Sequence, residues 1–122
     1  MNNTEVVNST SKYIVKTTGI GSETNQELVD AEKLAEGTDG SKVSLIECYY
    51  LIEGTGTLTI SAASETETQA AGKTVAKPLS LTGKGKYGLR PNQLKYGNDK
   101  IIKLTTDSNV KSYLLVTEFR RN

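Results

Sequence analysis

The 122 residues, 35% of them hydrophobic and with a net charge of only +1, suit a single domain whose thin sheets each give one face to water. The absence of histidine and the presence of one cysteine, Cys48, exclude Ser-His and Cys-His nucleophile pairs, most zinc sites and an internal disulfide. Without a membrane-length apolar segment or a signal peptide at the start, the sequence predicts a protein made in a cytoplasm, with no membrane partner.

The first third of the chain predicts an arm, one strand and one ambiguous element. Residues 1–10 are polar and without periodicity, so we expect a flexible N-terminal arm. Residues 12–18 predict a strand, broken by the glycines of residues 19–21. Residues 24–37 fit a capped helix with Leu28 on its apolar face, but equally a short strand followed by one helical turn. Both alternatives stay open.

The clearest strand covers residues 42–53, because apolar side chains occupy both of its alternating faces. This pattern predicts a central strand packed on both sides, with Cys48 as a buried and inert thiol. A glycine-containing turn then leads to a second strand at residues 57–61, which predicts a hairpin.

The rest of the chain predicts three further strands at residues 77–82, 86–90 and 100–105, and a long final strand at residues 110–119, with loops at residues 62–72 and 91–99. In the last strand, burial should fall mainly on Tyr113, Leu115, Val116 and Phe119. We therefore expect an all-β protein, an antiparallel β-sandwich of jelly-roll-like form with seven or eight strands and at most one short helix. Residues 11–122 would form this one domain.

The charges are unevenly distributed along the chain. Residues 1–67 hold eleven acidic and four basic residues, a net −7, whereas residues 68–122 hold three acidic and eleven basic residues, a net +8. A two-signed molecule that docks through oppositely charged patches is one interpretation. We favour the other, in which early and late strands interleave and their charges mix.

Catalytic and metal-binding motifs find little support. The glycines of residues 83–88 lack the spacing and the following helix of a phosphate loop. Glu47 and Glu53 would lie roughly 20 Å apart along one strand, whereas glycosidase carboxylates need about 5–9.5 Å; a cross-strand pair of Glu47 with Glu118 stays open. Asp39, Asp99 and Asp107 fit backbone hydrogen bonding in turns better than a calcium site. We expect no catalytic residue, no metal and no cofactor.

Two tyrosines near basic residues form the one candidate contact site. Tyr87 and Tyr96, with Arg90 and Lys95, could provide stacking rings for a glycan or a docking partner. The preferred interpretation is that tyrosine fills the half-buried rim of a sandwich, and we expect no nucleic-acid partner.

Three segments resemble small structural proteins of tailed-phage virions, especially the capsid decoration or cement proteins of marine and cyanobacterial phages: SKVSLIECYYLIEGTGTLTI at 41–60, LSLTGKGKYGL at 79–89 and KLTTDSNVKSYLLVTEFRR at 103–121. The resemblance implies a jelly-roll-like sandwich that sits on the outer surface of a phage head and stabilises contacts between capsid subunits. It favours a strand near residues 27–30, and it supplies no catalytic motif.

The function expected from this resemblance is that of a non-enzymatic decoration protein on the virion surface. Its expected partners are the major capsid protein of the head and further copies of itself, as a homotrimer. The alternatives are a glycan-binding β-sandwich module, which an exposed Tyr87–Tyr96 platform would favour, and a tail, neck or head-fibre component of the virion.

Overall fold

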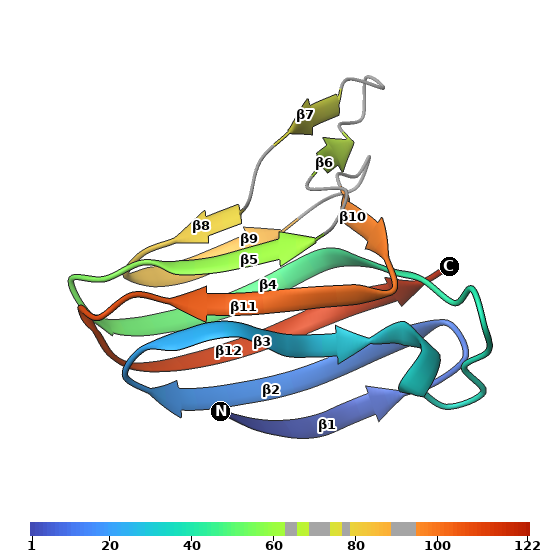
Figure 1. Cartoon of the computed structure of the whole chain (residues 1–122), viewed down its shortest axis with the longest axis horizontal. Helices are drawn as coiled ribbons and strands as arrows, with labels where there is room; N and C mark the ends of the chain where they lie inside the picture. Colours follow the sequence, from blue (N-terminus) through green and yellow to red (C-terminus); the bar gives the residue numbers. More distant parts are fainter. Residues whose placement is uncertain (63–65, 69–73, 77–78, 89–94) are drawn as a thin grey trace.

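The computed structural model describes residues 1–62, 66–68, 74–76, 79–88 and 95–122, which form twelve strands and one turn of 3-10 helix, η1 (Figure 1). The strands are β1 Asn2–Asn8, β2 Lys12–Ile20, β3 Glu23–Asp30, β4 Val43–Gly54, β5 Leu58–Ala62, β6 Thr66–Thr68, β7 Thr74–Ala76, β8 Leu79–Leu81, β9 Lys84–Gly88, β10 Lys95–Asp99, β11 Ile101–Thr106 and β12 Val110–Arg121; η1 is Ala31–Lys33.

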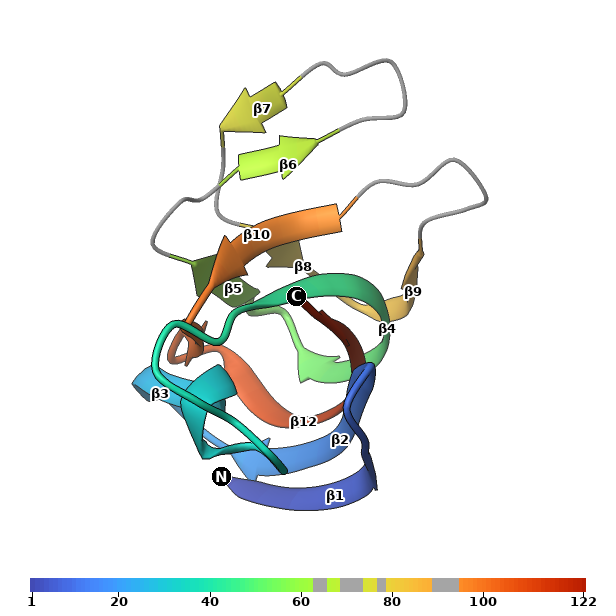
Figure 2. The same ribbon diagram turned by 90° about the vertical axis from the view of Figure 1, so that its right-hand side faces the viewer.

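Eight of these strands have the order of a jelly roll. One sheet runs β2-β12-β4-β9 and the other runs β3-β11-β5-β8, with every pair antiparallel. In Figures 1 and 2 the two sheets face each other as the layers of a sandwich. This arrangement confirms the expected all-β antiparallel sandwich and its jelly-roll-like topology. The remaining strands extend the first sheet: β1 pairs with β2, and β10 joins β4 to the β6–β7 hairpin.

The core lies between the two sheets and takes alternate residues from both. From the first sheet, the side chains of Val15, Leu45, Leu115 and Phe119 are completely buried. From the second sheet, Leu58, Ile60, Ile102 and Leu104 are completely buried. The rings of Tyr13 and Phe119 stack across the β2–β12 pair with centroids 6.3 Å apart. Inward apolar side chains that alternate along each strand, except at β-bulges, therefore build the sandwich.

The expectation that β4 is packed on both faces is wrong for its second half. The pairing with β12 shifts between Glu47 and Leu45, so Ile46 is an extra residue, a β-bulge. Before the bulge Val43 and Leu45 point into the core, and after it Cys48 and Ile52 do. A bulge exchanges which of two successive side chains points into the core. The core-facing residues therefore occupy odd positions before Ile46 and even positions after it, and in the sequence both alternating sets look apolar.

The N-terminal residues do not form the expected arm. Residues 2–8 are β1, which pairs antiparallel with β2 from Asn2 opposite Thr18 to Asn8 opposite Tyr13. Hydrophobic periodicity does not reveal this strand, because none of its side chains belongs to the hydrophobic core. The strand is held by its backbone ladder and by polar contacts, such as the 2.7 Å hydrogen bond that Thr17 donates to Asn3.

The ambiguous residues 24–37 form a strand followed by one helical turn, the second of the two alternatives. The carboxylate of Asp30 caps η1 by accepting a 3.1 Å hydrogen bond from the backbone N–H of Glu32. Leu28 and Val29 are both buried although adjacent, since the pairing with β11 shifts at this point. The helix-like spacing in the sequence instead joins Leu28 of β3 to Ala31 of η1 and to Leu34 just after it, all of which are buried.

Several boundaries differ from the expected ones. Strand β2 continues through Gly19 to Ile20, and Gly21, whose φ of +74° favours glycine, follows it. Strands β6 and β10 lie within segments expected to be loops, and β9 begins two residues earlier than expected and ends at Gly88. The interleaving of early and late strands is confirmed, and it pairs Glu47 with Lys86 at 2.6 Å and Glu32 with Lys100 at 3.2 Å.

Candidate docking surface

The outer face of the β2-β12-β4-β9 sheet carries a strip of hydrophobic side chains, which we call the apolar strip. On β4 it contains Tyr49, 52% exposed, and Leu51, 43% exposed. On β12, Val116 lies opposite Tyr49, and Leu114 lies opposite Leu51; both are half-buried. Four apolar side chains thus stand in two adjacent rows on a face that the sandwich core does not cover.

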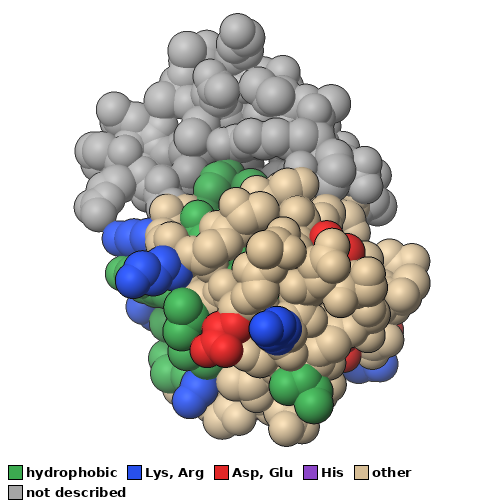
Figure 3. All heavy atoms as spheres, turned by 90° about the vertical axis from the view of Figure 1, so that its left-hand side faces the viewer, with side chains coloured by type: hydrophobic (Ala, Val, Ile, Leu, Met, Phe, Trp, Pro, Cys, Tyr) green, Lys and Arg blue, Asp and Glu red, His purple; other side chains and the backbone are tan. Residues whose placement is uncertain are grey.

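Lysines border the apolar strip on both sides. Strand β2 places Lys16 opposite Val116, and strand β9 places Lys86 opposite Tyr49 and Lys84 opposite Leu51. Because neighbouring strands lie about 4.8 Å apart, β2 and β9 are separated by roughly 14 Å across the strip. Figure 3 shows hydrophobic side chains next to Lys and Arg side chains along one side of the molecule.

The three lysines differ in their contacts. The Lys86 ammonium lies 2.6 Å from the Glu47 carboxylate and 5.1 Å from the centre of the Tyr49 ring. Hydrogen bonds to Glu47 and then to Tyr49 raise the pKa of Lys86. Lys16 and Lys84 form no ion pair within the described part of the chain, and both are exposed. Two positive charges are therefore available to a partner at opposite borders of the strip.

Two carboxylates lie at one end of the strip. Glu118 on β12 is directly opposite Glu47 on β4, so the cross-strand pair left open from the sequence does exist. Both lie on the outer face, where the ion pair with Lys86 occupies one oxygen of Glu47. Like charges directly opposite each other destabilise a sheet, and Lys86 offsets part of this repulsion.

The structure describes the side chain of only one of the four residues predicted as a contact site. Tyr87 points to the inner side of β9, opposite Cys48, and its ring packs against the hydrophobic core. It therefore does not provide an exposed stacking ring. Arg90 lies outside the described residues, as do the side chains of Lys95 and Tyr96, whose backbone forms β10. Both β9 and β10 pair with β4, so the fold brings these two strands to the same edge of β4.

The apolar strip itself was not recognised from the sequence. The sequence pattern predicts that Tyr49 and Leu51 are buried, because it does not show the bulge at Ile46 that turns them to the outer face. Val116 was expected to be buried, but it is half-buried on the outer face beside Leu114. The signal that could have found the strip is the run from Tyr113 to Val116, because four successive large apolar residues of a strand must present two of them to each face.

The single cysteine has the expected environment. Cys48 is completely buried, and desolvation raises its thiol pKa to about 12, opposed in part by a hydrogen bond with the Tyr87 backbone. The thiol therefore keeps its proton at neutral pH.

The turn aspartate Asp107 also acts as expected, since its carboxylate accepts 2.9 Å hydrogen bonds from the backbone N–H groups of Thr57 and Asn109. Across the ranges that the structure describes, no group of three or more acidic, cysteine or histidine residues is placed to hold a metal ion.

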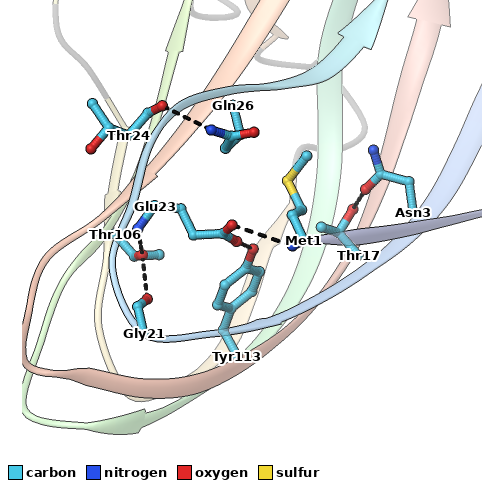
Figure 4. Close-up of polar contacts among 9 residues, drawn as sticks. All are labelled: Met1, Asn3, Thr17, Gly21, Glu23, Thr24, Gln26, Thr106 and Tyr113. Carbon is cyan, nitrogen blue, oxygen red and sulfur yellow. Dashed lines mark hydrogen bonds and ion pairs between the residues drawn. The ribbon is translucent and has the colours of Figure 1, made fainter.

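A separate polar cluster lies where β1 begins (Figure 4). The Glu23 carboxylate accepts a hydrogen bond from the Tyr113 hydroxyl and lies 3.3 Å from the amino group of Met1. Burial, and then the hydrogen bond to Glu23, raise the pKa of Tyr113. The Tyr113 ring lies against Gly19, where any larger side chain would collide with it. This cluster fixes β2, β3 and β12 to one another.

In the comparisons with known proteins, no family model, no curated sequence and no solved structure matched the chain. A search of the described residues for helices long and apolar enough to cross a membrane found none. The fold and the outer face of one sheet are therefore the basis for a functional proposal.

Proposed function

We propose that this protein is a non-enzymatic structural protein of a tailed-phage virion, which decorates the outer surface of the head and stabilises contacts between capsid subunits. The observation that carries the proposal is the apolar strip. Exposed contiguous apolar surface on a small sandwich marks an interaction site for another protein. The resemblance of three sequence segments to virion decoration proteins supplies the identity of the assembly.

The jelly roll supports this proposal without deciding it. It is a rigid scaffold that viral capsid proteins and lectins share, so the fold alone does not choose between capsid attachment and sugar binding. The glycan-binding alternative relied on an exposed Tyr87, and that ring packs against the core. The apolar strip on the outer face favours attachment to a protein surface.

The proposed partners are the major capsid protein and further copies of the chain. Weak contacts become effective on a phage head because many identical sites lie side by side. We propose a homotrimer as the attached form, which light scattering of the purified protein behind a sizing column would detect if the trimer already forms in solution.

The deciding experiment is quantitative mass spectrometry of virions purified from the phage that encodes the chain. A decoration protein should be present in a fixed ratio to the major capsid protein and should remain with the heads when tails are removed. Absence from the virion would refute the proposal. Presence on the tail fraction alone would move the protein to the tail or neck.

A further inference from the structure

The apolar strip and its bordering lysines describe the chemistry of a complementary surface. Tyr49, Leu51, Leu114 and Val116 offer a hydrophobic centre that remains partly exposed. Lys16 on one border and Lys84 on the other offer ammonium groups without ion-pair partners among the described residues. A surface of this kind gains most from a partner that covers the apolar centre and brings a carboxylate to each border.

We infer that the outer face of the β2-β12-β4-β9 sheet docks on an acidic protein surface with an apolar ridge flanked by carboxylates. This inference rests on the proposed function, in which the surface belongs to the capsid, and it adds the chemistry of the site that receives the decoration protein. The carboxylates should lie roughly 14 Å apart, the distance between β2 and β9.

A second copy of this chain fits the same face poorly. Two such faces docked on each other would bring Lys16, Lys84 and Lys86 of one copy close to the same lysines of the other. Like charges held against each other oppose association. Of the two carboxylates at the end of the strip, Glu47 is already paired with Lys86, which leaves Glu118 against three lysines. The charge distribution therefore favours a different, acidic partner.

The opposite outer face provides a matched control. Lys103 on β11 is an exposed lysine on the outer face of the other sheet, between Glu27 of β3 and Ser61 of β5. Reversing its charge changes the net charge of the protein in the same way as reversing Lys16 or Lys84. A difference between these variants reports position and not overall charge.

The test measures binding of the purified full chain to heads prepared from a phage deleted for its gene. Reversal of one border charge, in K16E or in K84E, should weaken binding by about threefold, and these single variants are the ones matched in net charge to K103E. Reversal of both in K16E/K84E should weaken binding by about tenfold, since each exposed ion pair contributes modestly and tenfold corresponds to about 1.4 kcal/mol. The neutral polar variant L51S/L114S should weaken binding by about tenfold as well, through loss of apolar contact. The control K103E should bind within about twofold of the wild type, because a charge distant from the contact acts weakly through salt. Thermal unfolding confirms that each variant is folded.

Each outcome decides between distinct failures. Equal loss of binding in K103E and in K16E/K84E would overturn the docking face and leave decoration intact. Loss in K16E/K84E with unchanged binding of L51S/L114S would indicate a contact driven by charge alone, such as one with nucleic acid, and would also overturn the inference. Failure of the wild-type chain to bind the deleted heads would refute the proposed function and the inference together.

Discussion

The outer faces of the two sheets differ although their inner faces are equivalent. On the first sheet the outward rows combine Tyr49, Leu51, Leu114 and Val116 with lysines. On the second sheet the outward residues of β11, β5 and β8 are small, polar or charged apart from the half-buried Ile101: Thr59, Ser61, Ser80, Lys103 and Thr105. Both sheets fill the core with the same kind of aliphatic side chain.

This difference shows which apolar residues the sandwich fold requires and which it does not. A sandwich needs one apolar face per sheet, and the second sheet shows that Thr and Ser suffice on the outer face. The outward Leu51 is 43% exposed, so a large part of its apolar surface remains in contact with water in the isolated protein. The outer face of the first sheet is therefore more apolar than the second sheet shows to be necessary, which is consistent with the proposed docking role.

The largest expected effects come from the inner faces, and they should be equal in the two sheets. Leu115 in β12 and Leu104 in β11 are both completely buried. Replacing either by alanine, L115A or L104A, should lower the free energy of unfolding by about 2–5 kcal/mol, because each substitution removes buried methyl groups and leaves a cavity. Urea denaturation measures the change. A loss in one sheet only would show that the two inner faces are not equivalent.

A second prediction compares the two faces of β4 through thiol chemistry. The pKa of Cys48 is raised to about 12 by burial, from a usual value of 9.0, whereas a cysteine placed at Leu51 would stand on the outer face. At pH 8 a disulfide reagent should label Cys48 roughly 1,000-fold more slowly than the introduced thiol of L51C, because three pKa units lower the thiolate fraction by that factor.

The same shift predicts a direction for stability. Native Cys48 holds its proton to higher pH than the unfolded chain does, so its contribution is complete below about pH 9 and falls as pH rises toward 12. The variant C48A, measured beside the wild type by urea denaturation between pH 8 and 10.5, should lack this part of the decline. In the labelling experiment with L51C, rapid reaction of Cys48 in the folded protein would contradict its position on the inner face of β4.

The sequence predicts the fold more completely than it predicts the docking surface. Alternating apolar residues in β5, β8 and β11 identify strands and their inward faces directly, since these strands lack an outward apolar residue that competes, apart from Ile101. Strand β1 escaped recognition because it adds no side chain to the core, and hydrophobic periodicity detects only strands that do.

The apolar strip could not be predicted from the sequence for a different physical reason. A single extra residue, Ile46, reverses which side chains of β4 face the core, and a bulge leaves no fixed signature in the sequence. The lysines that border the strip come from β2 and β9, which are far apart in the chain and meet only through the jelly-roll order. The register between neighbouring strands decides which lysines lie beside the strip, and this register is set only when the sheets assemble.

The smallest expected effects concern the two carboxylates at the end of the strip. Glu47 and Glu118 are opposite each other, but only Glu47 has an ion pair with Lys86, at 2.6 Å. Removing the charge of Glu118 in E118Q should raise stability by about 0.2–0.5 kcal/mol, because it relieves the repulsion and breaks no ion pair. Removing that of Glu47 in E47Q relieves the same repulsion but loses the partially exposed pair, so the net change should stay within about 0.5 kcal/mol of zero.

Thermal and urea unfolding at low salt resolve the sign for each variant, and high salt should reduce both differences through screening. A clear loss of stability in E118Q would mean that Glu118 makes a favourable contact on the outer face. A gain in stability in E118Q that exceeds the change in E47Q would confirm that the two carboxylates repel each other and that the ion pair with Lys86 stabilises only Glu47.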